Sequence, residues 1–590
     1  MNFNSRRSTV YSTRGIVSST QPLANEAGLK VLRAGGNCVD ACVAVAAVLC
    51  LTEPMSTGIG GCAFGLFYDN TANKVFGINA AGKSAAALSL DWLKENHPDH
   101  IKATLRLKDD SVFAIQVPGI IAGWCDAVDR WGSGKVSLAE ILAPAIDLAE
   151  NGYVISQQTA LLWKGQEAKL KRVNKISADL AVFLPNQGFS APVEGQFLQN
   201  AQFAETLRKV AQQGKAGFYK GDVARDIVAE LQSRGHVMTL EDLASHESQF
   251  VEPICVSVLG HKLWEIPPNG SGIIALLALG YINQLDADGV IDLQSLKHNS
   301  TEYLHVIIEC LKLAFRDSDD HVHDYRHYKE STGIDLEPDL KKLLHSSYFS
   351  KRTKHFSKSK VLDNNQIPRE VPDPSMRSDT VYLTVSDSDG NAFSFINSLY
   401  HHFGSGIVVP KHGFILQNRG DNFNLNPASK NCLAGGKRAY HTIIPGMITK
   451  QVDDKELLYA SYGIMGGFNQ PQAHVQVYLN MLLFGMKPQE ALDAPRLCLV
   501  PHPDFHHTDN GLGSDGPVST QVSLVNIEDG VAPEVVAGLR SLGHEVRILS
   551  NQQRSLFGRG QIIRREPDPH HLVYSGGSDP RGDGASVPFY

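Results

Sequence analysis

The sequence has no excess of positive charge and no long apolar run. Its 590 residues include 55 Lys and Arg against 62 Asp and Glu, a formal net charge of −7. This balance does not provide the basic face that nucleic acids and anionic lipids require. The longest apolar run, residues 43–51, is too short to span a bilayer, and the first residues, MNFNSRRSTVYSTRG, lack the apolar core of a secretory signal. We therefore expect a soluble, cytoplasmic protein with no nucleic-acid or membrane partner.

Cysteine is sparse, and its spacing forms no recognisable pattern. The chain has 9 cysteines, an odd number, and none of them forms a C-x-x-C pair. A disulfide framework and a zinc ribbon are therefore disfavoured. Cys38 and Cys42 lie four residues apart on an expected helix, but no histidine lies near them to complete a metal site. The pattern predicts buried free thiols, and we expect neither a metal nor a cofactor.

The rest of the composition is that of a large globular protein, with 42% hydrophobic and 20% charged residues. Apolar residues occur almost all round the segment 39–51, which predicts a helix buried in the central layer of the fold. Residues 138–320 alternate amphipathic helices with short connections that often end in glycine. Residues 347–379 are basic and then Pro-rich, which predicts an exposed linker.

A threonine stands where this linker ends. The run Thr380–Ser386 is strongly β-prone, Asp387–Gly390 is a turn sequence, and Asn391–Leu399 reads as a second strand. A hydroxyl is a poor nucleophile unless a base lies within hydrogen-bond reach, and the α-amino group of the same residue becomes such a base once the residue is a chain terminus. That amine has a pKa near ~8. Cleavage between Asp379 and Thr380 would create the nucleophile and its base together.

Other interpretations are open on the residues alone. Thr380 is also an ordinary β-branched residue at the start of a strand. The stretch Asp319–Asp324 contains an H-x-H pair that could bind zinc, although it continues a helical pattern. Gly58–Gly61 is rich in glycine, but no P-loop lysine follows it. A non-catalytic binding protein that is never cleaved is the main alternative to an enzyme.

A series of motifs along nearly the whole chain resembles one known family. In order they read RGIVSSTQPLANEAG, AGGNCVDA, EPMSTGIGG, VPGIIAGW, PAIDLAENGYVIS and PPNGSG, then the Thr-headed hairpin with DGNA and FGSG, and then GKRAYHTIIP, MGGFNQPQAHVQ, DAPR, GRGQII and SDPRGDG. This series resembles the gamma-glutamyltransferase superfamily of N-terminal-nucleophile hydrolases. The resemblance implies an α/β fold, a four-layer αββα sandwich made of two chains from one precursor. It implies a large subunit of about 1–379 and a small subunit of about 380–590 that stay entwined as one catalytic unit.

The resemblance also implies catalytic roles. Thr380 matches the family's nucleophile, and Ser398 matches the residue that hydrogen-bonds it. Gly466 and Gly467, in MGGFNQ, match the pair whose backbone amides form the oxyanion hole. Glycine suits that place because two amides must point at one oxygen without a Cβ in the way.

The predicted substrate-binding residues depart from the family pattern. His441 and Thr442 take the place of two serines; His441 could donate to the substrate, assist proton transfer or simply be satisfied by packing. Arg419 replaces a neutral Gln and Asn422 replaces an acid, the two residues that hold the α-amino group of glutamate in transferases. Tyr400 takes the place of an asparagine.

A further departure concerns the carboxylate of glutamate. The arginine that holds it in transferases aligns with Ala81. The charged clamp for a glutamate head group is therefore lost, and the pattern LQNRG looks like the acylase and amidohydrolase branch, which includes oxamate amidohydrolases and cephalosporin acylases. We expect Arg419 to contact a carboxylate, unless it points outward into an ion pair with Asp421.

The sequence thus predicts a self-cleaving amide hydrolase or acyltransferase. Its substrate would be a small gamma-glutamyl or related acyl amide, and the alternative is an oxamate- or cephalosporin-acylase-like amidohydrolase without gamma-glutamyl specificity. An uncleaved binding protein is the alternative of another class.

Overall fold

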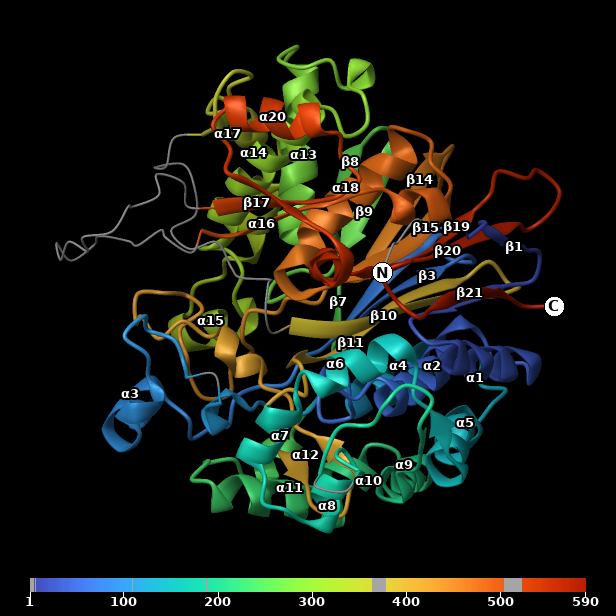
Figure 1. Cartoon of the computed structure of the whole chain (residues 1–590), viewed down its shortest axis with the longest axis vertical. Coiled ribbons are helices and arrows are strands. Elements are labelled where there is room, and N and C mark those ends of the chain that lie inside the picture. The colour runs from blue at the N-terminus through green and yellow to red at the C-terminus, as the bar shows by residue number, and fades with distance from the viewer. Residues whose placement is uncertain (1–4, 6, 109, 187–188, 363–377, 503–522) are drawn as a thin grey trace.

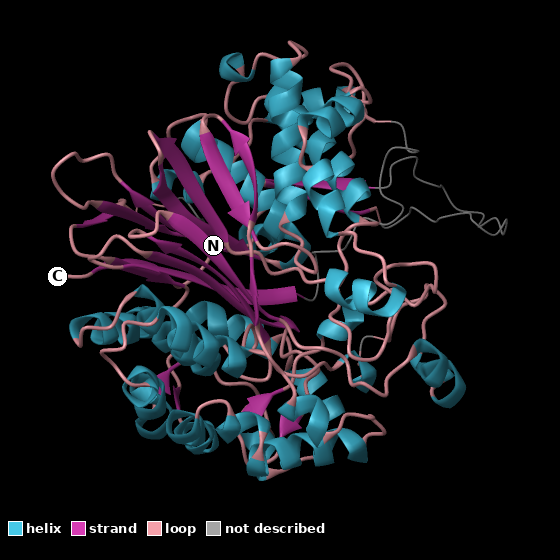
Figure 2. Ribbon diagram, turned by 180° about the vertical axis from the view of Figure 1, so that it is seen from behind, coloured by secondary structure: helices cyan, strands magenta, loops and turns pink. Residues whose placement is uncertain are grey.

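Two large antiparallel sheets form the centre of the molecule. The computed structural model describes all residues except 1–4, 6, 109, 187–188, 363–377 and 503–522. Each sheet has seven strands, and the sheets stack face to face between two helical layers (Figures 1 and 2). The first sheet contains, in spatial order, β1 (Val10–Ser12), β20 (Tyr574–Ser578), β19 (Arg559–Arg565), β15 (Lys455–Met465), β14 (Gly446–Val452), β9 (His261–Glu265) and β8 (Ile254–Val258). The predicted αββα sandwich is confirmed.

The second sheet carries the predicted hairpin in its middle. It contains, in spatial order, β21 (Ala585–Pro588), β2 (Ile16–Ser19), β10 (Ser378–Ser386), β11 (Ala392–His401), β3 (Cys62–Asp69), β4 (Lys74–Ala80) and β7 (Gln249–Val251). This sheet therefore combines strands from before and after Thr380, and the hairpin lies between β2 and β3, which both precede it. Asp387 shapes the turn of the hairpin, since its side chain accepts from the amides of Asp389 and Asn391, both at 3.0 Å.

The helices cover the two outer faces (Figure 1). One layer contains α1 (Pro22–Arg33), α2 (Cys38–Thr52), α4 (Ile120–Trp131), α5 (Leu138–Asn151) and α9 (Ala201–Gln213). The other contains α13 (Ile273–Ala287), α14 (Thr301–Ser318), α17 (Ser346–Thr353), α18 (Gln470–Leu482) and α20 (Pro533–Ser541). None of these helices, nor any other in the described ranges, is both long and apolar enough to cross a membrane.

The remaining elements are short and lie mostly at the periphery. The helices are α3 (Leu90–Asn96), α6 (Gln157–Lys164), α7 (Glu167–Val173), α8 (Ala178–Ala181), α10 (Ala216–Tyr219), α11 (Gly221–Ser233), α12 (Leu240–Ala244), α15 (Tyr325–Thr332), α16 (Glu337–Leu343) and α19 (Pro488–Asp493). The strands are β5 (Tyr153–Val154), β6 (Phe197–Leu198), β12 (Val408–Val409), β13 (Phe414–Ile415), β16 (Leu497–Pro501), β17 (Ser523–Glu528) and β18 (Val546–Leu549).

Two predictions need correction. Helix α2 is buried over its whole length as predicted, but it lies in a helical layer and not in the central one, because the sheets occupy the centre. It contacts β10 and β11 on one side and α5 on the other, which explains why it is apolar all round.

The linker predicted at 347–379 is wrong for its first part, since residues 346–353 form α17, whose Phe349 packs against α13. Residues 363–377 of that linker lie outside the described residues.

The cysteines agree with the prediction of free thiols. Seven of the nine are buried, two are partly buried and none is in a disulfide. Burial raises the pKa of Cys50 to about 12 and that of Cys125 to about 12, so these thiols stay protonated.

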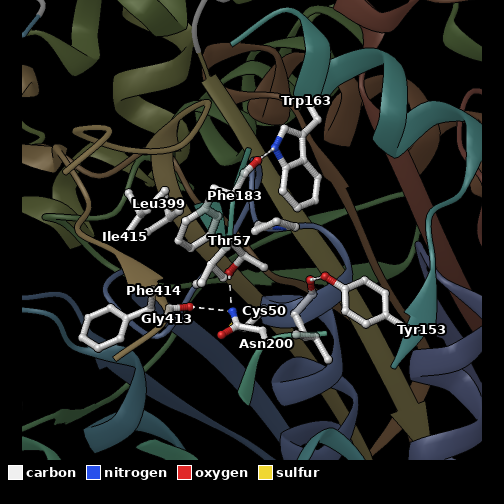
Figure 3. A pocket seen from close by; sticks show the side chains of 14 residues that line it. Cys50, Thr57, Tyr153, Trp163, Phe183, Asn200, Leu399, Gly413, Phe414 and Ile415 are labelled. Atoms are coloured by element: carbon white, nitrogen blue, oxygen red, sulfur yellow. Dashed lines mark hydrogen bonds between the residues drawn. The ribbon is translucent and has the colours of Figure 1, made fainter. Parts of the chain in front are cut away.

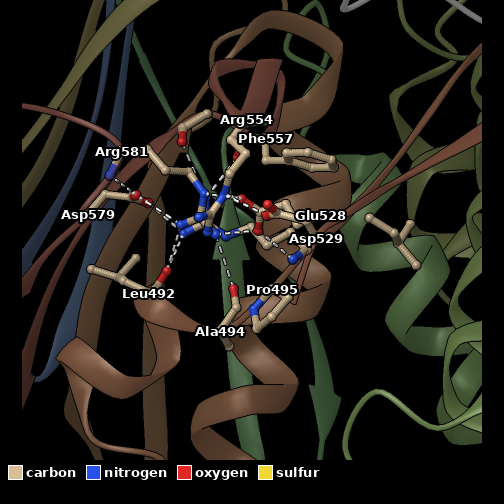
Figure 4. Close-up of polar contacts among 12 residues, drawn as sticks. Leu492, Ala494, Pro495, Glu528, Asp529, Arg554, Phe557, Asp579 and Arg581 are labelled. Carbon is tan, nitrogen blue, oxygen red and sulfur yellow. Dashed lines mark hydrogen bonds and ion pairs between the residues drawn. The ribbon is translucent and has the colours of Figure 1, made fainter. Parts of the chain in front are cut away.

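A buried ionic network holds the C-terminal segment against other segments that follow Thr380 in the chain (Figure 4). Arg581, fully buried, pairs with Glu528 and, at 3.0 Å, with Asp579. Arg496 donates to the other oxygen of Asp579 at 2.5 Å, and Arg554 donates to Glu528 at 2.8 Å. Burial alone would lower the pKa of Arg581, but the two carboxylates raise it above its usual value. Each charge therefore relies on its partners.

We predict that Arg581→Met destabilises the protein by ~3–5 kcal/mol, because it leaves two buried carboxylates short of a partner. Denaturant unfolding measures this. The control is Arg326→Ala, which removes one partner of the exposed pair Arg326–Glu330 and should leave the midpoint unchanged. Equal midpoints for the two variants would contradict the prediction.

Candidate active site

The predicted nucleophile lies on the face of its sheet that meets the other sheet. On that face of β10, Thr384 hydrogen-bonds Ser461 of β15 at 2.6 Å. Thr380 is fully buried and its Oγ1 donates to Oγ of Ser398 at 3.1 Å. The structure thus brings together the two hydroxyls that the sequence paired.

The hairpin ladder is irregular at the predicted cleavage point. Asp379 pairs with Tyr400, but the register shifts before Val381 pairs with Asn397. Irregularities of this kind re-aim a side chain and are common beside active sites. The side chain of Asp379 lies outside what the structure describes, so its predicted part in cleavage stays a prediction.

Ser398 is the meeting point of several hydrogen bonds. Besides the contact with Thr380, its Oγ accepts from the amide of Tyr400 at 2.8 Å and from Nη2 of Arg419 at 3.0 Å. Arg419 also donates from Nη1 to Oγ1 of Thr442 at 2.7 Å. A guanidinium therefore lies two hydrogen bonds away from the predicted nucleophile.

Arg419 is buried without a carboxylate partner among the described residues. Its side chain is 1% exposed, its Nε has no acceptor, and burial lowers its pKa to about 10, so it is charged at neutral pH. The outward ion pair with Asp421 that the sequence left open does not form, because Asp421 lies 3.3 Å from Nε2 of His401 instead. The guanidinium lies over the ring of Tyr400, 4.3 Å from its centroid. A ring face stabilises such a cation only in part.

Tyr400, whose ring lies against this cation, is hydrogen-bonded to Asn422. The Tyr400 hydroxyl donates to Oδ1 of Asn422 at 2.6 Å, so the amide nitrogen of Asn422 faces away from that bond and has no acceptor. Tyr400 has a φ of 81°, a left-handed conformation that is rare for a bulky residue. Strain of this kind persists where the surroundings impose it and is concentrated at functional sites.

His441 is a buried neutral histidine. Burial and then the charge of Arg419 hold its pKa well below the usual range, which excludes an imidazolium at neutral pH. Its ring lies 4.6 Å from that of Phe64. Nδ1 accepts from the amide of Ile443 at 3.4 Å, so the proton is on Nε2, and Nε2 has no acceptor among the described residues. Packing alone does not satisfy this histidine.

The predicted oxyanion glycines form a tight turn at the end of β15. Gly466 has a φ of 134° and Gly467 a φ of 55°, conformations that favour glycine. No hydrogen bond joins either amide to another of the described residues. The short helix that follows, η6 (Gly467–Asn469), packs against β10. Two free amides therefore lie beside the strand of Thr380.

Sequence reasoning missed two residues near this site. Arg438 is buried and donates from Nε to the carbonyl of Ala81 at 3.0 Å, so a guanidinium of another segment lies where the aligned arginine is absent. Asn469, two residues after Gly467, is buried with no partner for either side-chain polar atom among the described residues. The position of Asn469 two residues after the glycine pair was the one available signal.

The metal hypothesis at Asp319–Asp324 gains no support. The ring of His323 stacks on that of Tyr325 at 4.3 Å, and burial lowers the pKa of His323 to about 4. Where three potential ligands do gather in the described part of the chain, they are His97, Asp99 and His100, or His305, Glu309 and His544. Neither group includes a residue of this site.

An apolar pocket lies beside Leu399, the neighbour of Ser398 (Figure 3). Side chains alternate along a strand, so Leu399 points to the opposite face from Ser398. Trp163, Phe183 and Phe414 line this pocket with Cys50, whose thiol is protonated as described above. It therefore lacks an activated nucleophile.

Comparison with known proteins agrees with the geometry. The family described as Gamma-glutamyltranspeptidase matches residues 24–589. The chain is 32% identical to the glutathione hydrolase-like YwrD proenzyme of Bacillus subtilis (strain 168), covering 98% of this chain and 99% of that protein. It is 29% identical to the oxamate amidohydrolase proenzyme of Klebsiella pneumoniae, covering 98% of each.

A solved structure supports the same assignment. The cephalosporin acylase from Bacillus halodurans superposes with a TM-score of 0.83 at 35% identity, covering 99% of this chain and 98% of that one. The fold and the extent of these matches place the chain, over nearly its whole length, in the gamma-glutamyltranspeptidase family.

Proposed function

We propose that this chain is a proenzyme that cuts itself between Asp379 and Thr380 and then uses Thr380 to hydrolyse acyl amides. Three features support the proposal: the Thr380–Ser398 hydroxyl pair, the unpaired amides of Gly466 and Gly467, and the break in the ladder at the cleavage point. Relatives over the same length are named as proenzymes, which agrees with such a cut.

Self-cleavage would proceed by transfer of the chain from nitrogen to oxygen. The Thr380 hydroxyl attacks the carbonyl carbon of Asp379, and the peptide C–N bond breaks as the nitrogen takes up a proton. Water then hydrolyses the ester and leaves a carboxylate on residue 379 and a free amine on Thr380. The products would be the predicted subunits 1–379 and 380–590, which both contribute strands to the second sheet.

The mature enzyme would use the same hydroxyl on an external amide. The new α-amine takes the Thr380 proton, the substrate carbonyl forms an ester, and the protonated amine supplies a proton to the leaving group. Negative charge on the carbonyl oxygen would be stabilised by the amides of Gly466 and Gly467. Water or another amine then accepts the acyl group.

The proposed substrate follows from the buried guanidinium of Arg419, which has no carboxylate partner among the described residues. A carboxylate on the acyl half would pair with it, and the unpaired donors Asn422 Nδ2 and His441 Nε2 belong to the same neighbourhood. The α-ammonium of a gamma-glutamyl group would meet these donors and a cation. We therefore propose acyl amides that carry a carboxylate but no α-ammonium. Because Arg419 is two hydrogen bonds from Thr380, short acyl chains fit best.

The names of the relatives bear on this choice. Oxamate is an amide whose acyl half ends in a carboxylate, and the oxamate amidohydrolase relative agrees with a cation at Arg419. The name of the glutathione hydrolase-like relative supports the other choice, a gamma-glutamyl amide substrate. A substrate panel separates the two, and a chain that is never cut would support the binding-protein alternative.

Mass spectrometry of purified protein should show two chains divided between Asp379 and Thr380. Thr380→Ala should stay as one chain of 64.3 kDa and turn over no amide, because the nucleophile is gone. Thr380→Ser should keep part of both activities, since it retains a hydroxyl and, after cleavage, an amine. A wild-type preparation that is uncut and yet active would refute the proposal.

Arg419→Gln should lower kcat/KM for oxalyl and succinyl anilides by at least ~10-fold, since a hydrogen bond to a charged group contributes about 1.5–3 kcal/mol. Wild type should prefer these compounds to gamma-glutamyl anilide. The rate with an uncharged butyryl anilide measures any loss of activity that comes from the missing hydrogen bond between Arg419 and Ser398, and the other rates are corrected for it.

Lys411→Gln is the matched control, since it removes one positive charge from a side chain that is 76% exposed. It should leave all ratios unchanged. A wild-type preference for gamma-glutamyl anilide that Arg419→Gln does not alter would show that another residue binds the head group.

A further inference from the structure

The side chain of Asn469 is buried without a partner beside the oxyanion turn. It is 0% exposed, and neither Oδ1 nor Nδ2 has a hydrogen-bond partner among the described residues. Burying an amide in this way costs free energy unless a ligand completes its hydrogen bonds. The side chain of Asn469 therefore requires a hydrogen-bond partner that a bound ligand could supply.

The position of this amide relates it to Gly466. A Cβ built on Gly466 would lie 3.3 Å from Nδ2 of Asn469, and the backbone amide of Asn469 donates to the carbonyl of Gly466 at 3.0 Å. The side chain of Asn469 therefore lies against Gly466, whose own backbone amide is unpaired. Both belong to the turn that packs against β10, the strand of Thr380.

The backbone of Gly558 packs closely against this turn. A Cβ on Gly558 would lie 1.9 Å from the carbonyl of Met465 and 3.0 Å from Nδ2 of Asn469, so there is no room for a larger residue at this position. Arg496 donates to the carbonyl of Phe557 at 2.8 Å and thereby connects this backbone to the buried ionic network. A donor on such a support needs little reorganisation during a reaction.

We infer that Asn469 is a third oxyanion donor, whose Nδ2 joins the amides of Gly466 and Gly467 in stabilising the tetrahedral intermediate on Thr380. The inference rests on the proposed function. An amide donor suits an oxyanion because it offers an N–H without adding charge to a site that already contains Arg419. It acts on the reacting carbonyl oxygen and not on the carboxylate of the acyl half.

Asn469→Ala should lower kcat by ~10²–10³-fold and leave KM within about twofold, as expected when one oxyanion donor is lost. The affinity for a boronic acid analogue of the acyl group, which forms a tetrahedral adduct with Thr380, should fall by a similar factor. The affinity for the free product carboxylate should fall less than that for the boronate, because the product is planar and the proposed donor favours the tetrahedral adduct. Counting mature N-terminal threonines by mass spectrometry corrects each rate for the fraction of cleaved enzyme.

Asn469→Asp is the second variant, since it keeps the shape and exchanges the donor for an acceptor. Its kcat should be lower than that of Asn469→Ala at neutral pH and should partly recover as the carboxyl group is protonated. The control is Asn526→Ala, which removes a buried asparagine in the separate sheet of β16, β17 and β18 and should leave boronate affinity unchanged.

The outcomes separate this inference from the proposed function. Wild-type protein that is uncut or turns over no amide refutes the proposed function. Mature Asn469→Ala with wild-type kcat and boronate affinity overturns the role of Asn469 and leaves the proposed function standing. If Asn469→Ala does not mature, Asn469→Asp provides the same comparison, and wild-type boronate affinity in that variant also overturns the inference.

Discussion

The insertion of the β10–β11 hairpin between β2 and β3 is the constraint on which the site depends. Hydrogen-bonded ladders fix β10 against β2 on one side and β11 against β3 on the other. Since a one-residue slip would turn every side chain to the opposite face, these ladders also decide that Thr380 and Ser398 face the first sheet. The same interleaving means that a cut before Thr380 would leave strands of both products in one sheet. The backbone could be opened at that point without separating the layers that form the site.

The energetic cost of the site lies mostly in its unpaired polar groups. A buried guanidinium with no carboxylate is unfavourable, and hydroxyl partners and one aromatic face offset that cost only in part. The ionic network around Arg581 shows the contrast, because there every buried charge has an opposite charge beside it. A cation that is left unpaired beside the proposed nucleophile, in a protein that pairs the buried charges around Arg581, supports the proposal that an anion binds there. This asymmetry is the physical reason for preferring a carboxylate to an ammonium in the acyl half.

The buried ionic network is connected through the backbone to the turn that contains Gly466 and Asn469. Arg496 links the carboxylate of Asp579 to the backbone of Phe557, and Gly558 then packs on the turn that contains Gly466 and Asn469. Substituting a larger residue at Gly558 would push against the carbonyl of Met465. The buried charges therefore contribute to the precision of the turn as well as to the stability of the fold. Rigid support of this kind is what an oxyanion site requires, because donors that must first reorient stabilise the intermediate less.

Local sequence determined the parts of this protein that depend on near neighbours. The β-prone run after Thr380 and the DSDG turn predicted the hairpin, and the ordered series of motifs predicted the sandwich and named the residues that are proposed for the site. The short strands β7, β8 and β9 lie within a segment whose pattern predicts helices. Residues 347–353 belong to the predicted linker, but they form part of α17, and Phe349 packs them against α13. Burial and pairing were decided only by the tertiary structure. Whether Arg419 meets Asp421, whether His441 is charged and whether Asn469 has a partner all depend on residues far away in the chain that packing brings together. A sequence states which groups are present, but the free energy of a buried polar group depends on what surrounds it.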